Sequence, residues 1–147
     1  MKKISLILII ILGIATYLQK TDTGSNPFLI NNEQNDRIAL NISKAYQNRL
    51  SNVQVKGQGI IQRVLRDDNQ GRRHQKFILH LPSGQSLLIA HNIDLAPRIK
   101  DLKKGDSIEF YGEYEWNSKG GIVHWTHRDP GGRHINGWLK HNNRSYQ

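Results

Sequence analysis

The stretch VQVKGQGIIQRVL, residues 53–65, decides the fold. Its apolar side chains recur with a period of two, which predicts a β-strand. Gly57 and Gly59 stand in its middle, where glycine permits a bulge or a sharp bend. Both faces are partly apolar, with Val53, Val55 and Ile61 on one side and Ile60 and Val64 on the other. The pattern therefore predicts one long, strongly bent strand.

Further strands follow at short intervals. The segment DDNQGRR, residues 67–73, predicts a turn, and HQKFILHLPSG (74–84) and QSLLIAHN (85–92) predict the next two strands. Residues 92–106 show no clean alternation. A fifth strand is expected in GIVHWTH (121–127), and GWLKHNNRSYQ (137–147) predicts a closing hairpin around Asn142 and Asn143.

The clearest alternation belongs to SIEFYGEYEWN, residues 107–117. Ile108, Phe110, Tyr114 and Trp116 face one way, and Glu109, Tyr111, Glu113 and Glu115 face the other. Five strands with a bent first strand and a break before the fourth predict a mainly β protein with a small OB-like barrel. An open meander and an SH3-like barrel are the alternatives.

The N-terminal region has the features of an export signal. Lys2 and Lys3 precede an almost entirely apolar run, Ile4 to Leu18, and small residues lie at 13–15. The run is shorter than the roughly 20 residues that span a bilayer, so a cleaved signal is favoured over a membrane anchor for residues 1–20. The protein is therefore expected to be exported, either periplasmic or secreted. Residues 21–35 predict a linker, 36–51 an amphipathic helix that covers the core, and 52–147 the OB-like barrel domain.

The composition favours an anionic partner. Lys and Arg number 21 against 12 Asp and Glu, a net charge of +9, and the chain has no cysteine. Disulfides, thiolate catalysis and cysteine metal sites are thereby excluded. A basic exported domain suits nucleic acid or an envelope glycan, with membrane contact only through a retained N-terminal segment. The candidate binding residues are basic (Arg63, Arg66, Arg72, Arg73, Lys76) and aromatic (Tyr111, Trp125, Trp138).

The motif HWTHRDPGGRH, residues 124–134, concentrates polar chemistry around a turn. His124 and His127 point to opposite faces of a regular strand, which disfavours a metal clamp unless the strand bulges near Thr126. Asp129 has an ordinary role as the acceptor of backbone N–H groups within the turn. His134 follows the turn and is able to fold back toward His127.

Strand ends on one rim of a barrel gather together, so a shared polar site is a hypothesis. Its candidates are His74, His91, Asp94, Arg98, His124, His127, Arg128, Asp129, Arg133 and His134. Imidazole and carboxylate suit zinc or manganese, but the spacing matches no specific metal motif and indicates no particular cofactor. The simpler alternatives are that these groups order a loop and that Asp94 pairs with Arg98. His80 and His141 are interpreted as surface residues.

Four long motifs are similar to a bacterial family of uncharacterised exported proteins, domain of unknown function 3465. They are RVLRDDNQGRRHQKFIL, IAHNIDLAPRI, GDSIEFYGEYEWN and GGIVHWTHRDPGGRHINGWLKHNNRSYQ. The resemblance implies a fold and no activity. Within these motifs it draws attention to Asp67, Asp68, His74, Gln75, His91, Asn92, Asp94, Arg98, His124, His127, Asp129 and His134.

Two functions remain open from the sequence. The first is a noncatalytic module that binds an anionic polymer. The second is a metal-assisted phosphodiesterase or nuclease, with aspartates as metal ligands or base and arginines for phosphate. Binding is favoured because no pair of carboxylates has a persuasive spacing.

Overall fold

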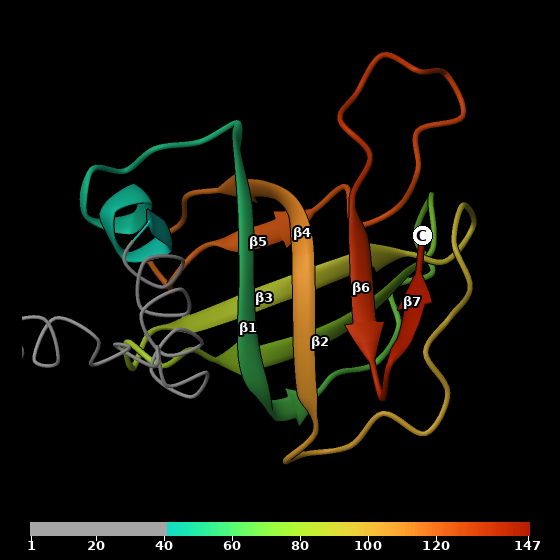
Figure 1. Cartoon of the computed structure of the whole chain (residues 1–147), viewed down its shortest axis with the longest axis horizontal. Helices are drawn as coiled ribbons and strands as arrows, with labels where there is room; N and C mark the ends of the chain where they lie inside the picture. The colour runs from blue at the N-terminus through green and yellow to red at the C-terminus, as the bar shows by residue number, and fades with distance from the viewer. Residues whose placement is uncertain (1–40) are drawn as a thin grey trace, which may run out of the picture. The chain divides into compact units, whose positions relative to one another are not determined.

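The computed structural model describes residues 41–147. It begins with a helix whose described part is 41–47, and this confirms the predicted N-terminal helix. Ile42 and Ala45 point into the core, where they are 1% and 4% exposed. Tyr46 stacks on Trp116 at a centroid distance of 6.4 Å. The helix therefore covers one side of the sheet (Figure 1). The predicted signal and linker, residues 1–35, lie outside the described residues.

Strand β1, Val53–Val64, is the long bent strand predicted from its glycines. It pairs with β4 (Ser107–Glu115) from Val53 to Ile60 and with β2 (His74–His80) from Ile60 to Val64. The register with β2 shifts between Ile61 and Arg63, as expected for a bulge. A Cβ on Gly59 would lie 3.0 Å from the His80 carbonyl oxygen. Glycine thus permits the close approach at the bend.

The remaining pairings close the barrel. Strand β2 pairs antiparallel with β3 (Ser86–Asn92), which runs parallel to β5 (Ile122–His124). Strand β5 pairs with β4, and β4 returns to β1. The closed order β1-β2-β3-β5-β4 confirms the small five-stranded OB-like barrel (Figure 1).

The C-terminal hairpin is also confirmed. Strands β6 (Trp138–His141) and β7 (Arg144–Tyr146) are joined by Asn142 and Asn143, whose φ angles are 48° and 61°. Asparagine tolerates this left-handed conformation better than most residues, and a two-residue turn of this kind matches the twist of the strands. Strand β6 pairs with β4 over Glu109–Tyr111, the length of β4 that β5 leaves free.

The core follows the predicted alternation. Ile108, Phe110 and Tyr114 of β4 are 0% exposed, as is Leu139 of β6. One histidine differs from its prediction: His141 is 6% exposed, and its Nε2 lies 3.0 Å from Asp106 Oδ2. The carboxylate of Asp106 thus satisfies a polar ring that was expected at the surface. Between residues 41 and 147, no helix is long and apolar enough to cross a membrane.

Candidate binding face on strands β4 and β6

The outer face of β4 carries rows of side chains that continue onto its neighbours. Tyr111 lies between Lys56 of β1 and Trp138 of β6 in the registered sheet. Glu113, two residues further along β4, lies between Gln54 of β1 and His124 of β5. Because alternate residues share a face, these two rows are neighbours on the surface.

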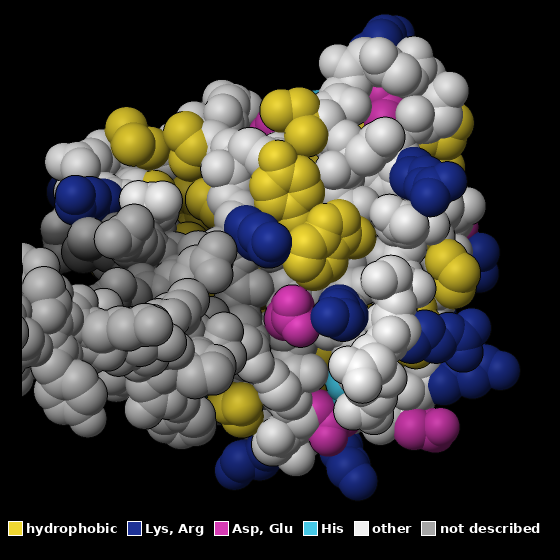
Figure 2. All heavy atoms as spheres, in the orientation of Figure 1, with side chains coloured by type: hydrophobic (Ala, Val, Ile, Leu, Met, Phe, Trp, Pro, Cys, Tyr) yellow, Lys and Arg dark blue, Asp and Glu magenta, His cyan; other side chains and the backbone are white. Residues whose placement is uncertain are grey.

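Tyr111 and Trp138 form the feature that we call the aromatic platform. Their ring centroids are 6.2 Å apart with an angle of 34° between the planes. Lys56 Nζ lies 5.6 Å from the Trp138 ring centroid, within cation–π range. Figure 2 shows hydrophobic side chains gathered in the centre of this face, with Lys and Arg side chains beside them. The sequence predicted both rings as surface residues, and the hairpin brings them together.

The connection between β5 and β6 is an ordered loop, residues 125–137, which extends from the barrel (Figure 1). Asp129 orders its turn, because its carboxylate accepts the N–H groups of Gly131, Arg133 and His134 at 2.7–2.9 Å. The hydrogen bonds from Gly131 and Arg133 lower the pKa of Asp129. These bonds are the structural role that the turn motif predicts.

His134 is held between a carboxylate and an indole. Its Nε2 lies 2.7 Å from Glu113 Oε2, and its Nδ1 donates to the Ile135 carbonyl at 3.0 Å. Its ring stacks on Trp125. Burial lowers the pKa of His134, but the hydrogen bonds to Ile135 and Glu113 outweigh it, so the pKa is raised. The arrangement favours the imidazolium form, in which both ring nitrogens donate.

His124 lies beside the same carboxylate. Its Nε2 is 3.5 Å from Glu113 Oε1 and 3.8 Å from Glu115 Oε1. We call these three residues the Glu–Glu–His cluster; their ligating atoms all lie within 4.8 Å of one another. Burial lowers the pKa of His124, although Glu113 and Glu115 act in the opposite direction. The sequence predicted His124 as a site residue, but it identified the two glutamates only as members of one strand face.

The other predicted histidines have separate environments. His91 is fully buried; its Nε2 donates to the Pro97 carbonyl at 3.2 Å, and its Nδ1 lies 2.9 Å from Thr126 Oγ1. Burial lowers its pKa to about 4. His127 is 3% exposed, with Nδ1 2.7 Å from the Arg128 carbonyl oxygen. Trp125 has a φ of 52°, which breaks the strand before Thr126, yet His124 and His127 do not form a clamp, because each has different partners.

His74, at the start of β2, donates from Nδ1 to the Arg72 carbonyl at 2.7 Å. The ring of Trp125 contacts two of the predicted histidines. His134 stacks on it, and the His127 ring lies at a centroid distance of 5.3 Å from it. The structure gives His74 and His91 different hydrogen-bond partners. Among the described residues, no single hydrogen-bonded group contains His74, His91, His127 and His134 together.

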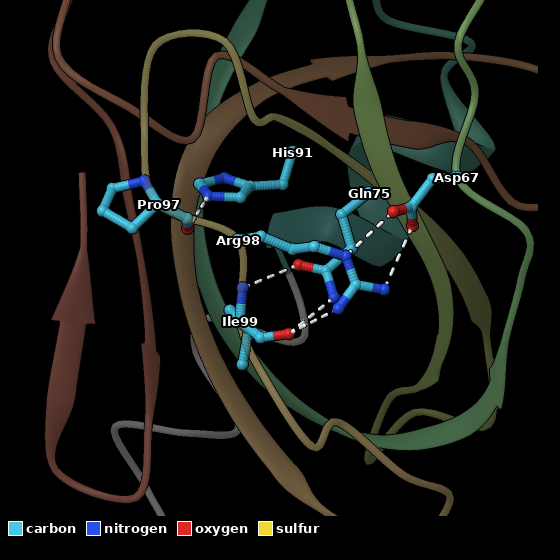
Figure 3. Close-up of polar contacts among 6 residues, drawn as sticks. All are labelled: Asp67, Gln75, His91, Pro97, Arg98 and Ile99. Carbon is cyan, nitrogen blue, oxygen red and sulfur yellow. Dashed lines mark hydrogen bonds and ion pairs between the residues drawn. The ribbon is translucent and has the colours of Figure 1, made fainter.

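A buried amide fixes the loop that follows β3 to the barrel (Figure 3). Gln75 is fully buried and bonds both the N–H and the carbonyl of Ile99, each at 2.9 Å. Arg98 pairs with Asp67 at 2.8 Å, and Asp94 pairs with Arg73 at 2.6 Å. The expected pairing of Asp94 with Arg98 is therefore wrong, because each has a partner across the β1–β2 loop. These two predicted site residues act in structural ion pairs.

One pocket of about 280 Å³, which we call the rim pocket, joins several predicted residues. Arg72, Asp94, Trp125, Asp129 and Arg133 all line it. Asp94 is paired with Arg73, whereas Asp129 accepts only backbone N–H groups, so Arg72 and Arg133 contribute more positive charge to the pocket than Asp129 offsets. Neither Arg72 nor Arg133 forms an ion pair within 4.0 Å in the described chain.

The other predicted basic residues lie away from the aromatic platform. Arg63 and Arg66 are exposed at the end of β1 and in the following loop, and Lys76 of β2 pairs with Asp68 at 3.2 Å. Arg128 is exposed on the β5–β6 loop. Lys56 takes the position beside the platform, and the register of β1 with β4 was the signal needed to place it.

The fold and this face define a class: an OB-type barrel whose added hairpin completes an aromatic platform. The chain belongs to the family described as Protein of unknown function (DUF3465), whose model matches residues 29–147. No curated protein matches the sequence.

Proposed function

We propose that this protein is an exported, noncatalytic module that binds a single-stranded anionic polymer on the outer face of β4 and β6. The observation that carries the proposal is the aromatic platform with Lys56 beside it. Unpaired bases stack on exposed aromatic rings, and nearby cations attract the backbone. Single-stranded nucleic acid is therefore the polymer that this surface fits best.

The surface continues from the platform toward the rim pocket. Tyr111 and Glu113 share a face of β4, and Glu113 contacts His134, whose ring stacks on Trp125. Trp125 also lines the rim pocket with Arg72 and Arg133. A strand that stacks on the platform would thus pass an imidazolium before it reaches two arginines. This order of aromatic and cationic groups suits a polymer better than a small ligand.

Two of the three glutamates on this face are compensated. Glu109 pairs with Lys140 at 3.4 Å, and Glu113 pairs with His134 at 2.7 Å. Because these partners offset the charge of Glu109 and Glu113, they reduce the repulsion between this face and phosphate. Lys56, Arg72 and Arg133 form no carboxylate ion pair within 4.0 Å among residues 41–147.

A metal-assisted phosphodiesterase is the second candidate, and the Glu–Glu–His cluster is the observation that favours it. Three metal ligands beside a polymer surface would be able to activate a water for attack on phosphorus. Binding is preferred because the platform needs no further component to stack a base. Strand cleavage that a chelator abolishes would distinguish the enzyme from the binding module.

The test uses the full chain and a labelled single-stranded oligonucleotide, with fluorescence anisotropy and strand length followed together. Trp138→Ala and Tyr111→Ala are each expected to cost about 1–3 kcal/mol, an affinity loss of roughly 5- to 150-fold. Tyr46→Ala is the control, because that ring packs on Trp116 rather than on the platform. Circular dichroism verifies the fold of each variant.

Three results would change the conclusion. Unchanged affinity in a folded Tyr111→Ala/Trp138→Ala variant would place the binding site elsewhere. Binding of an anionic glycan but of no oligonucleotide would reassign the polymer. Binding of neither polymer would refute the proposal.

A further inference from the structure

We propose that Glu113, Glu115 and His124 form a binding site for one divalent transition-metal ion of the zinc class. The proposed binding of a polymer does not require this site; only the alternative phosphodiesterase activity depends on it. The cluster is built from two strands, because β4 supplies both glutamates and β5 supplies the histidine. Paired strands hold ligands more precisely than a loop does.

The spacing of the ligand atoms fits a tetrahedral ion. Zinc binds imidazole nitrogen and carboxylate oxygen at about 2.0–2.2 Å, so two ligands of one tetrahedron lie roughly 3.4 Å apart. His124 Nε2 lies 3.5 Å from Glu113 Oε1 and 3.8 Å from Glu115 Oε1. Only Glu115 has to move appreciably, and its side chain is 32% exposed. A small rotation of this side chain would complete the three-ligand set.

A buried nitrogen without a partner gives an independent reason for a ligand. His124 Nε2 is fully buried as an atom and has no hydrogen-bond partner among the described residues. Gln54 Nε2, from the residue that faces Glu113 across the sheet, has the same property. A buried polar atom that is left unsatisfied destabilises the folded state. Coordination of an ion by Nε2 would remove this destabilisation for the histidine.

The carboxylate of Glu113 is already held in position by a neighbouring histidine. Its Oε2 accepts a hydrogen bond from His134 Nε2 at 2.7 Å, and its Oε1 is the atom that faces His124. Oε2 of Glu113 is therefore occupied by His134, while Oε1 is available to a metal ion. A histidine that fixes a ligating carboxylate is a common outer-shell partner in metal sites. Trp125 in turn fixes the ring of His134 by stacking on it.

The charge of the cluster also favours a cation. Two carboxylates lie on one face of β4 at alternate positions, and His134 offsets one of them. One negative charge therefore remains beside His124, and it would attract a cation. Three protein ligands would leave at least one coordination position for water or for an exogenous oxygen. This open position would lie on the same face as Tyr111, one alternation along β4.

The test is metal binding by the full chain, purified without a histidine tag and without any polymer present. Zn²⁺ affinity is measured by competition with a chromogenic chelator, and Co²⁺ is added separately to read the coordination geometry from its visible spectrum. One ion per chain and a tetrahedral or five-coordinate Co²⁺ spectrum are expected. His124→Gln and Glu115→Gln should each weaken Zn²⁺ binding by at least about tenfold, since each removes a direct ligand.

Glu109→Gln is the matched control, because Glu109 lies on the same face of the same strand but pairs with Lys140. Its Zn²⁺ affinity should equal that of the unaltered chain. Absence of saturable binding, or equal affinity in His124→Gln and the unaltered chain, would overturn the site. If His124→Gln fails to fold by circular dichroism, Glu115→Gln decides, since Glu115 is one-third exposed. Because no polymer is present, failure here leaves the proposed binding function untouched and removes only the phosphodiesterase alternative.

Discussion

Trp125 and His134 lie face to face, with ring centroids 4.0 Å apart and 6° between the ring planes. They lie nine positions apart in the sequence, and the Pro-Gly-Gly turn between them allows the chain to fold back. The stack places His134 against Glu113 of β4. An imidazolium on an indole gains a cation–π attraction in addition to its ion pair. The contact therefore joins the loop to the binding face.

Glu113→Gln should lower the pKa of His134. Burial opposes the charged ring, whereas the Ile135 carbonyl and Glu113 stabilise it, and the net pKa is raised above 6.5. Removal of the Glu113 carboxylate takes away one of the groups that stabilise the charged ring of His134, so its pKa should fall. NMR titration of His134 with a chelator present measures the shift, and Glu109→Gln serves as the control. An unchanged pKa in Glu113→Gln would contradict the assignment of this ion pair.

The same pair should make stability depend on pH in a defined direction. A raised folded-state pKa adds stability that is fully present below about pH 6.5 and is lost as the pH rises through the folded value. The difference in free energy of unfolding between the unaltered chain and Glu113→Gln should be about 0.5–1 kcal/mol larger at pH 5.5 than at pH 8.5. Urea unfolding at both pH values measures it. A difference independent of pH would show that His134 does not titrate against Glu113.

His91 should destabilise the fold in mild acid. Burial lowers its pKa to about 4, so the neutral ring is favoured in the native state. The preference for the neutral ring stabilises the fold fully above about pH 6.5. This stabilisation, about 3 kcal/mol in total, is lost as the pH falls toward the pKa of His91 in the folded state. Urea unfolding between pH 7 and 4 should show this decline, and His91→Gln should flatten it. The carboxylates with lowered pKa values, such as Asp94 and Asp129, act mainly below this range.

Lys56→Gln should reduce the salt dependence of oligonucleotide binding. Each neutralised phosphate of a single strand contributes about 0.7 to the slope of log affinity against log salt. Lys56 lies beside Trp138, where a stacked base would bring its phosphate close. Anisotropy titrations at several salt concentrations measure the slope. Lys44→Gln, an exposed lysine of the helix 41–47, should leave it unchanged.

Gly137→Ala should unfold the domain or cost more than about 3 kcal/mol. A Cβ at this position would overlap the backbone oxygens of Trp125 and Tyr111, which cannot move independently of the sheet. Gly84→Ala is the comparison, because its φ of 84° is strained for alanine while its surroundings are open. That variant should cost about 1 kcal/mol. Similar melting temperatures for the two variants would contradict the close packing at Gly137.

The barrel was largely predictable because its signals are local. Alternation in residues 107–117 assigns the two faces of β4, and the glycines of residues 53–65 mark the bend of β1. The paired asparagines at 142 and 143 mark the hairpin turn. Each of these signals depends on a few consecutive residues, so the backbone preferences and the periodicity are readable without the tertiary structure.

The site was less predictable because its contacts join distant residues. Glu113 and His134 are separated by 21 positions, and their contact depends on the path of the β5–β6 loop. His141 is buried because Asp106, 35 positions earlier, lies beside it. The Glu113–His124 pair had an available signal, since the SKGG turn sets the hairpin register between β4 and β5. Alternation alone placed Glu113 and Glu115 on one face of the strand, but it did not identify them as ligands.

The nine residues of the hairpin β6–β7 divide into inward positions that pack in the core and outward positions that form the surface. Its inward residues, Leu139 and Tyr146, are 0% and 7% exposed and belong to the core, whereas Trp138 and Lys140 face outward. The five barrel strands close on one another without it. Under the proposed function, the outward positions can therefore vary to change which polymer is recognised, while the inward positions and the barrel keep the scaffold intact. The outward face of the terminal hairpin could in this way be exchanged without disturbing the barrel.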